Sequence, residues 1–328
     1  MRENKKQIIF LTLCFCVFIT NVVAASQHQI SSIIHTTCTN DKIIYVDDDN
    51  TLGPWDGSIE HPYQTIQEGL SHAESDDTIY VFSGTYYSSG VFNSISLQKP
   101  VKLQGEGPQT TVIRGYGAKW VVSINNDQGA CSISGFTIEN SGTDSHDAGI
   151  LVSADNSTIS NNIIRGNVIG IYFSDSRIQA NTQILGNIIE QNNHGIFMWG
   201  ASHNLIKNNI IRNNRFDGIN IIYRDGNVIQ LNTISGHTFP SESEGIMIEI
   251  SRDNFITQNN FLENIRDAYF RNGFCNTWQN NYWNAARKTP KLIFGEFVLS
   301  SGPMEPGIRI PLIRIDRNPA QESFNISI

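Results

Sequence analysis

The position directly before a recurring glycine carries a run of ionisable side chains in the second half of the chain. His194, Asp217, Glu244 and Arg266 occupy it in successive repeats, at steps of 23, 27 and 22 residues. Two carboxylates one strand spacing apart share a proton, bind a cation or pair with a base. Asp217, Glu244 and His194 are therefore candidate catalytic residues for acid–base chemistry on a glycoside. The alternative is that these residues only close a turn by bonding local backbone.

Calcium is the one cofactor that this pattern suggests. Asp217 and Glu244 together could supply carboxylate oxygens to Ca²⁺. The acidic run Asp47–Asn50 is a second place where Ca²⁺ could bind, with a solvated acidic loop as the alternative.

A second set of candidate residues is mostly aromatic and lies on the outward side of the strand that follows the same glycine. An alternating strand turns this position outward, away from the side that the apolar residues bury. Sugar rings stack on aromatic faces, and an exposed apolar strip commonly marks a contact surface. A covering loop or tail is the alternative. The predicted substrate-binding residues are Tyr172, Phe197, Trp199, Tyr269 and Asn220.

Two insertions leave the repeat next to these columns. The link into the glycine strand is usually six or seven residues long, but it is eleven at Ile138–Gly149 and at Ile234–Gly245. Loops on rigid repeat scaffolds often carry binding residues. We therefore expect both insertions to stand beside the aromatic strip.

An internal repeat must position all of these residues. A Gly-Ile-x-apolar segment begins at Gly149 and returns after 21, 25, 23, 27 and 22 residues. A second segment, close to Ile-x-x-Asn-x-apolar, lies between its copies. Such short alternating strands cannot bury themselves alone, whereas coils stacked about 4.8 Å apart bury a continuous isoleucine core. The recurring asparagines are Asn162, Asn187, Asn209, Asn232, Asn259 and Asn281.

This repeat predicts an all-β fold, a right-handed parallel β-helix. Each recurring asparagine is expected to stack on the asparagine of the next coil and to satisfy a buried turn. A leucine-rich repeat fits less well, because the short links leave no room for a helical leg.

The segments on both sides of the repeat are expected to close its ends. Ile66, Leu70 and Ala73 share one helical face, which predicts a short capping helix at the N-terminal end. Prolines interrupt residues 285–328, so this tail is expected to be an irregular C-terminal cap. Its alternative role is partner binding or cell-surface attachment. We predict a signal peptide at residues 1–25, the β-helix with its N-terminal cap at residues 43–284, and the capping tail at residues 285–328.

The N-terminus indicates export. Basic residues in Met1–Lys6 precede the apolar run Ile8–Ile19 and small residues around Ala24. This order is typical of a secretory signal peptide, and the run is short for a membrane span. We expect a secreted or extracytoplasmic monomer without a transmembrane segment in the mature chain.

Charge and cysteines exclude several classes of function. The formal net charge of −8 becomes −10 when the first 25 residues, with three basic residues and one acidic residue, are removed. Such a surface disfavours nucleic acids as partners. Three cysteines remain after residue 25, without the spacing of a metal cluster or a disulfide framework. Cys131 is expected to be a small core residue.

Whole motifs of the chain resemble pectin-lyase-like right-handed β-helix proteins. Tyr45–Asp49, His61–Ile66, Asp77–Tyr86 and Gly105–Gly107 look like the opening of that fold. The repeats, with Asn280–Trp283, resemble the periplasmic copper-protein maturation factor NosD and its carbohydrate-binding and sugar-hydrolase relatives. The resemblance covers about residues 43–284. It implies the fold but no single chemistry, because this fold hosts lyases, hydrolases, adhesins and non-enzymes.

Three functions follow as expectations. The first is an exported protein that binds a polysaccharide or cell-surface glycan along the aromatic strip. The second is a polysaccharide lyase or glycoside hydrolase that uses Asp217 and Glu244, although the Trp-Ile-Asp-His motif of pectate lyases and the Gly-His-Gly motif of polygalacturonases are absent. The third, implied by the resemblance, is a NosD-like assembly factor for a metalloprotein, although no Met or His pair has ligand spacing. Whether the chain is an enzyme stays open.

Overall fold

The computed structural model describes residues 41–89, 94–174, 179–240, 243–299, 308–326 and 328. Contacts divide the chain into a unit that ends at Asp41 and a unit that spans Lys42–Ile328. All described secondary structure lies in the second unit. The predicted signal peptide lies outside the described residues. Within those residues no helix is long and apolar enough to cross a membrane.

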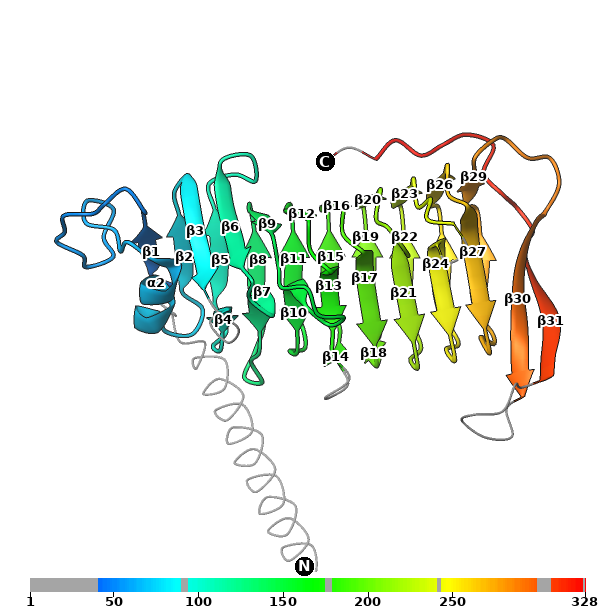
Figure 1. Ribbon diagram of the computed structural model, residues 1–328, viewed down its shortest axis with the longest axis horizontal. Coiled ribbons are helices and arrows are strands. Elements are labelled where there is room, and N and C mark those ends of the chain that lie inside the picture. Colours follow the sequence, from blue (N-terminus) through cyan, green and yellow to red (C-terminus); the bar gives the residue numbers. More distant parts are fainter. Residues whose placement is uncertain (1–40, 90–93, 175–178, 241–242, 300–307, 327) are drawn as a thin grey trace, which may run out of the picture. The chain divides into compact units, whose positions relative to one another are not determined.

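The predicted parallel β-helix is confirmed: short strands stack into about eight turns (Figure 1). Three sheets run along the stack, and a two-stranded sheet joins β14 (Gln179–Ala180) to β18 (Ala201–Ser202). Sheet A consists of β1 (Ile43–Val46), β2 (Thr78–Val81), β5 (Lys102–Gly105), β8 (Ser132–Ser134), β11 (Thr158–Ser160), β15 (Gln183–Leu185), β19 (Leu205–Lys207), β22 (Val228–Gln230), β25 (Phe255–Thr257) and β28 (Thr277–Gln279).

The other two sheets complete each coil. Sheet B consists of β3 (Gly84–Ser89), β6 (Thr111–Tyr116), β9 (Thr137–Glu139), β12 (Ile163–Arg165), β16 (Ile188–Glu190), β20 (Ile210–Arg212), β23 (Thr233–Ser235), β26 (Asn260–Leu262) and β29 (Tyr282–Trp283). Sheet C consists of β4 (Ile95–Leu97), β7 (Trp120–Ile124), β10 (Ala148–Val152), β13 (Ile169–Phe173), β17 (His194–Trp199), β21 (Ile219–Ile222), β24 (Glu244–Glu249), β27 (Arg266–Arg271), β30 (Lys291–Leu299) and β31 (Ile308–Asp316).

Isoleucine fills the interior in register. Ile159 pairs with Ile184 in sheet A, Ile164 with Ile189 in sheet B, and Ile171 with Ile196 in sheet C; all six are fully buried. Burying such a side chain contributes about 1.5–3 kcal/mol. Because each strand turns alternate residues inward, a slip of one residue would expose the whole set, so this core fixes which side chains face outward.

The recurring asparagines form the predicted axial ladder, and two further ladders run beside it. In each, a side-chain amide donates to the amide oxygen of the next coil at 2.9–3.1 Å. These buried amides satisfy the turns that the short strands leave open. The ladders are Asn162–Asn187–Asn209–Asn232–Asn259–Asn281, Asn204–Asn227–Asn254–Asn276, and Asn167–Asn192–Asn214.

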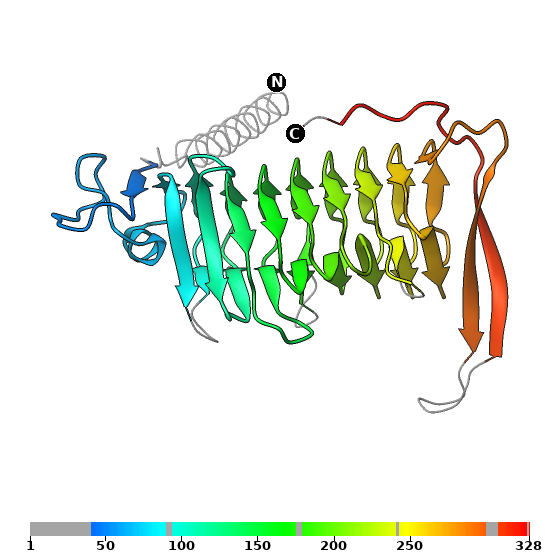
Figure 2. The same ribbon diagram turned by 45° about the horizontal axis from the view of Figure 1, so that its top comes forward.

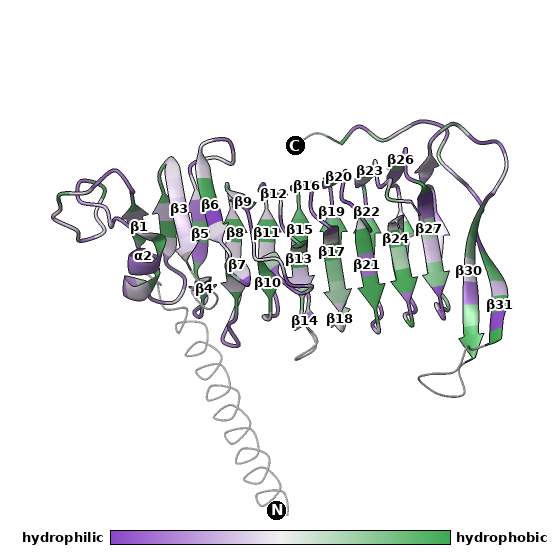
Figure 3. Cartoon of the chain, viewed as in Figure 1, coloured by the Kyte–Doolittle hydropathy of each residue, from purple (hydrophilic) through white to green (hydrophobic). Residues whose placement is uncertain are grey.

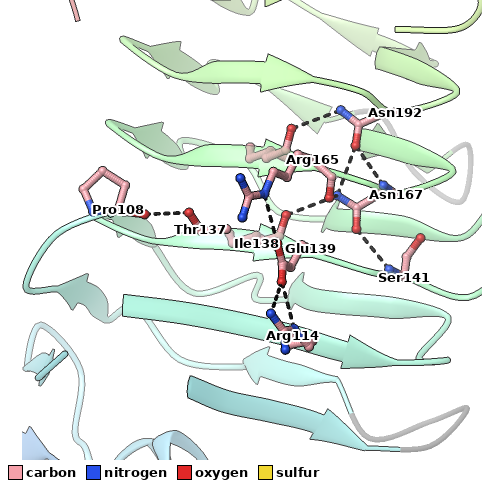
Figure 4. A network of polar contacts seen from close by, with 10 residues as sticks. Pro108, Arg114, Thr137, Ile138, Glu139, Ser141, Arg165, Asn167 and Asn192 are labelled. Carbon is pink, nitrogen blue, oxygen red and sulfur yellow. Dashed lines mark hydrogen bonds and ion pairs between the residues drawn. The ribbon is translucent and has the colours of Figure 1, made fainter. Parts of the chain in front are cut away.

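Charged side chains alternate along the outer face of sheet B. Glu139 lies between Arg114 and Arg165, one on each neighbouring coil, and accepts hydrogen bonds from both guanidinium groups (Figure 4). Both partners lower the pKa of Glu139 against the effect of its burial, so the carboxylate stays ionised. The same figure shows the ladder amides of Asn167 and Asn192 at the adjacent corner.

A short helix closes the N-terminal end, as predicted. Helix α2 (Ile66–His72) begins with a capping box in which Thr65 and Glu68 exchange hydrogen bonds. Ile66 and Leu70 are buried, and Ala73 directly after the helix is also buried. The helix therefore lays its apolar face over the first coils.

The C-terminal end is closed by a regular hairpin where we expected an irregular cap. β30 continues sheet C beside β27, and β31 pairs with it antiparallel (Figures 1 and 2). Pro311 is tolerated because β31 is the edge strand, where a missing N–H breaks no ladder bond. Ile293 packs into the core, while other apolar side chains of both strands stay exposed. Figure 3 shows hydrophobic residues along both strands.

The buried carboxylate of Asp316 ends the first asparagine ladder. It accepts hydrogen bonds from the backbone N–H and the side-chain amide of Asn281, and from the indole Nε1 of Trp283. The last coil thus finds an acceptor where another coil would otherwise follow. Cys131 is buried, as predicted, and Cys275 is exposed; both are free thiols.

Candidate functional site

The ionisable column of the sequence is assembled at one edge of sheet C. His194, Glu244 and Arg266 begin β17, β24 and β27, and Asp217 lies two residues before β21. Asp217 contacts both neighbouring coils. Its Oδ2 atom lies 3.6 Å from the Nδ1 atom of His194, and its Oδ1 atom accepts the backbone N–H of Glu244 at 3.3 Å. The predicted adjacency of these residues is therefore confirmed, while their chemical role stays a prediction.

Arg266 and Asn220 complete the cluster. A guanidinium nitrogen of Arg266 lies 2.7 Å from Oε1 of Glu244. The side-chain amide of Asn220 donates to Oδ2 of Asp217 at 2.7 Å. The carboxylates of Asp217 and Glu244 are both buried, whereas a quarter of the His194 side chain is exposed. His194 is thus the member that reaches the surface.

The two carboxyl groups hold one proton between them. Burial raises the pKa of Glu244 from its ordinary 4.5 to about 8, and the adjacent Asp217 adds to this through a hydrogen bond and its charge. Burial would also raise the pKa of Asp217, but its contacts with His194, Glu244 and Asn220 bring it below the ordinary value. Glu244 is therefore the protonated member of the pair near neutral pH, and Asp217 is the charged one.

Three buried polar atoms around Asp217 have no hydrogen-bond partner among the described residues. They are Nδ1 of His194, Oδ1 of Asn220 and Nε2 of His237. His237 is fully buried, and burial lowers the pKa of its imidazole. Unsatisfied buried groups cost stability, and three of the nine such atoms among the described residues lie in this cluster.

His237 stands where the third ladder needs an asparagine. It follows Asn214 in the stack, and its Nδ1 atom contacts the backbone carbonyl of Asn214 at 3.2 Å. The backbone N–H of His237 donates to Oδ1 of Asn264 on the next coil. The imidazole offers Asn214 no amide oxygen, so the ladder stops beside the ionisable cluster. Sequence reasoning missed this residue as a rung.

The aromatic column runs along the outer face of sheet C, as its register requires. Tyr172 pairs with Phe197, and Met247 pairs with Tyr269. Phe197, Trp199 and Tyr269 are partly exposed, but Tyr172 and Asn220 are buried, contrary to the expected exposure. We use "sheet C strip" below for Phe197, Trp199 and Tyr269 with Tyr223, a neighbouring side chain that is 46% exposed.

The first insertion explains why Tyr172 is covered. His146 lies in the link between β9 and β10, and its ring centroid is 5.7 Å from that of Tyr172 and 6.4 Å from that of Trp199. Its carbonyl accepts the indole N–H of Trp120 at 3.3 Å. These contacts form a small apolar cluster outside the solenoid core. At this end of the strip, the alternative that a loop covers the aromatic side chains is therefore correct.

The second insertion packs beside His194. The ring of Phe239 meets Phe216 edge-on at 5.1 Å, and Phe216 stacks on His194 at 5.0 Å. The guanidinium of Arg215 lies over both phenylalanine rings, 5.2 and 4.6 Å from their centroids. Both insertions thus flank the strip, as expected. Arg215, Phe216 and Tyr223 were missed because they fall outside the strict two-residue alternation.

This arrangement fits acid–base chemistry better than metal binding. Within the described ranges, no group of three or more His, Cys, Asp or Glu side chains is placed to hold a metal ion. Hydrogen-bond donors already surround Asp217, and Glu244 faces a guanidinium, so the pair does not fit the proposed Ca²⁺ site. In the acidic loop, Asp47 and Asp48 accept backbone N–H groups instead.

The burial of the carboxyl pair limits which acid–base chemistry is feasible. A glycoside hydrolase places its two carboxyl groups on either side of the scissile bond, where both reach the substrate. Asp217 and Glu244 are both buried, and Glu244 faces Arg266. The pair is therefore not placed to flank a glycosidic bond. A buried aspartate that orients a surface histidine fits proton abstraction at the exposed imidazole better.

The chain matches one protein-family description, "Periplasmic copper-binding protein (NosD)", over residues 72–299. That description names copper, but the described residues contain no group of three or more His, Cys, Asp or Glu side chains placed to hold a metal ion, so we derive no step through copper. Comparison with curated proteins gave no match.

Three solved structures show the same fold at low sequence identity. The pectate lyase Pel9A has a TM-score of 0.60 and 13% identity, with 76% of this chain and 72% of that chain covered. ORF18 of Geobacillus virus E2 has a TM-score of 0.54 and 14% identity over 84% of this chain. The chain spans only 64% of the length of that viral protein. The A-module of the Azotobacter vinelandii mannuronan C-5 epimerase AlgE4 has a TM-score of 0.51 and 14% identity, covering 74% of this chain and 79% of that chain.

Proposed function

This chain belongs to the NosD family, and we propose that it is an extracytoplasmic protein that binds a polysaccharide along the sheet C strip. The observation that carries the proposal is a set of three exposed or partly exposed aromatic side chains, Phe197 and Trp199 on β17 and Tyr223 on the next coil. Tyr269 lies two coils further along the sheet, with the guanidinium of Arg266 over its ring. Trp199 lies 6.3 Å from Phe197 and 6.2 Å from Tyr223, measured between ring centroids. Rings in such a row offer a linear chain of sugars successive stacking faces.

The rigid core supports this role. Phe197 and Trp199 alternate in β17 with the buried Ile196 and Met198, so the backbone fixes the direction of both aromatic side chains. Coils are stacked about 4.8 Å apart, which is comparable to the length of one pyranose unit. A preformed surface of this kind loses little conformational entropy on binding.

The charges beside the strip favour a polysaccharide that carries carboxylates. Arg215 is exposed and contacts only aromatic rings among the described residues. Arg266 faces Glu244, which is neutral near pH 7, so its positive charge is not cancelled. These cations offset the repulsion that the acidic chain as a whole exerts on an acidic polymer.

Alanine substitution with a matched aromatic control tests the proposal. Binding of polygalacturonate, alginate and dextran would be measured by calorimetry, with and without Ca²⁺. Trp199→Ala is expected to weaken binding of at least one polymer about tenfold, since lost stacking costs about 1.4 kcal/mol. Tyr116→Ala, which removes a 78% exposed ring from sheet B, should leave it unchanged. Equal affinities for the parent and both variants would refute the strip as the binding surface.

Proton abstraction from the bound polymer is a second candidate function. It is favoured by the contact between His194 and the buried Asp217, which would hold the imidazole Nδ1–H inward and leave Nε2 facing the strip. A lyase or epimerase reaction starts with such a step. Assays for unsaturated and reducing products would detect it, and Asp217→Asn should lower the rate more than it weakens binding. Absence of product from every polymer that binds would leave the protein a binding module.

A further inference from the structure

A cavity lies in the first coils of the solenoid, far in sequence from the residues of the sheet C strip. Its volume is about 970 Å³, which lies within the range of small-molecule sites. Side chains from the N-terminal end of α2, from β3 and from β4 line it. The lining residues are Asp48, Gln64, Thr65, Ile66, Gln67, Thr85, Tyr86, Tyr87, Ser94, Ile95, Ser96 and Gln98.

The lining is polar but almost uncharged. It includes three glutamine amides and several hydroxyl groups, and no lysine, arginine or histidine. The amides of Gln64 and Gln67 have no hydrogen-bond partner among the described residues, so both are available to a ligand. An amide presents a donor and an acceptor at once, which matches the vicinal hydroxyl groups of a sugar.

Asp48 is the one ionisable carboxylate in the lining. Its Oδ2 atom accepts the backbone N–H of Thr85 at 3.0 Å, which fixes the orientation of the group. Its Oδ1 atom is buried and has no hydrogen-bond partner. That oxygen packs against Gly84 and is closed to a ligand, but the carboxylate still repels a second carboxylate in the cavity. The cavity therefore selects against anionic ligands.

The cavity lining also includes an exposed aromatic ring. Tyr87 is 58% exposed, whereas its neighbour Tyr86 is buried and donates its hydroxyl to the carbonyl of Phe82 at 3.0 Å. Burial, with the nearby Asp48, raises the pKa of Tyr86, so that hydroxyl stays protonated. Tyr86 thus belongs to the wall, whereas Tyr87, whose hydroxyl interacts with Arg114, exposes its ring to a ligand.

We propose that this cavity binds a neutral sugar unit, which stacks on Tyr87 and exchanges hydroxyl hydrogen bonds with Gln64 and Gln67, while Asp48 disfavours anionic sugars. The site shares no residue with the sheet C strip, and its ligand differs in charge from the polymer expected there. Either proposal can therefore fail without the other.

The test uses the purified exported chain and a pair of probes that differ at one carbon. Saturation-transfer NMR and calorimetry would compare galactose with galacturonate, alongside glucose, mannose and N-acetylglucosamine. At least one neutral sugar should bind saturably at millimolar concentration. Galacturonate should bind at least tenfold more weakly than galactose. Failure of every neutral sugar to saturate, or equal binding of the matched pair, would overturn the proposal.

Variants locate the site. Tyr87→Ala and Gln67→Ala change exposed side chains, and each should weaken binding of the neutral sugar at least fivefold with an unchanged melting temperature. Tyr116→Ala, which removes a 78% exposed ring outside both sites, is the matched aromatic control and should have no effect. Loss of neutral-sugar binding in Tyr116→Ala, or its retention in both cavity variants, would place the sugar elsewhere and refute the assignment. The comparison of galactose with galacturonate on the parent chain needs no variant.

Discussion

Replacing Glu244 with glutamine should make the stability of the protein less dependent on pH. Glu244 is protonated in the folded chain near neutral pH, where it lies beside Asp217 and faces Arg266. Glutamine has nearly the same shape and keeps one donor and one acceptor at the end of the side chain. At low pH the variant and the parent should therefore be equally stable.

The pKa of Glu244 sets the size of the effect and its direction. In the folded chain it is about 8, against the ordinary value of 4.5 that applies after unfolding. The folded state therefore binds more protons than the unfolded state between these two values. The stability that protonated Glu244 contributes is complete below about pH 4.5 and is lost as the pH rises through about 8. A pKa difference of this size corresponds to about 5 kcal/mol.

Urea unfolding at several pH values between 4.5 and 9 measures this directly. The difference in unfolding free energy between Glu244→Gln and the parent should grow from near zero to a few kcal/mol as the pH rises. Glu249→Gln is the control, because it removes a carboxylate from the same strand that pairs with Arg271 and has no carboxyl partner. Parallel pH profiles for the parent and Glu244→Gln would show that the pair does not hold a proton.

Two further substitutions test the ladders. His237→Asn restores the missing rung and gives the amide of Asn214 an acceptor, so it should raise the unfolding free energy by about 1–2 kcal/mol; a lower melting temperature would contradict this. Asp316→Ala leaves buried donors of Asn281 and Trp283 without an acceptor, and should lower the unfolding free energy by at least about 3 kcal/mol. An unchanged urea midpoint for Asp316→Ala would mean that the hairpin does not hold the last coil.

Most of the register was predictable, because glycine and asparagine recur at fixed places in each coil. The two extra ladders were also predictable in principle. Each rung stands five residues before or after a rung of the first ladder, as Asn204 and Asn214 do around Asn209. His237 stands five residues after Asn232, where this spacing calls for an asparagine, and could have been noticed for that reason.

Exposure and protonation could not be predicted in the same way. Alternation gives the direction of Tyr172, but the path of the insertion that carries His146 decides whether water reaches it. The proton on Glu244 depends on burial and on its distance from Asp217, neither of which the repeat specifies. The hairpin was missed because prolines disfavour strands in general, yet Pro311 lies on an edge.

The interrupted ladder has a mechanical consequence. Lines of amides act as tension members along the solenoid, and a pull along its axis must break them coil by coil. From the coil of Asn162 to the coil of Asn281 every joint is crossed by two such lines, because the line through Asn214 ends at the coil where the line from Asn204 begins. The load therefore passes from one line to the other at the coil of Asn209, and two amide–amide hydrogen bonds resist the pull at each joint.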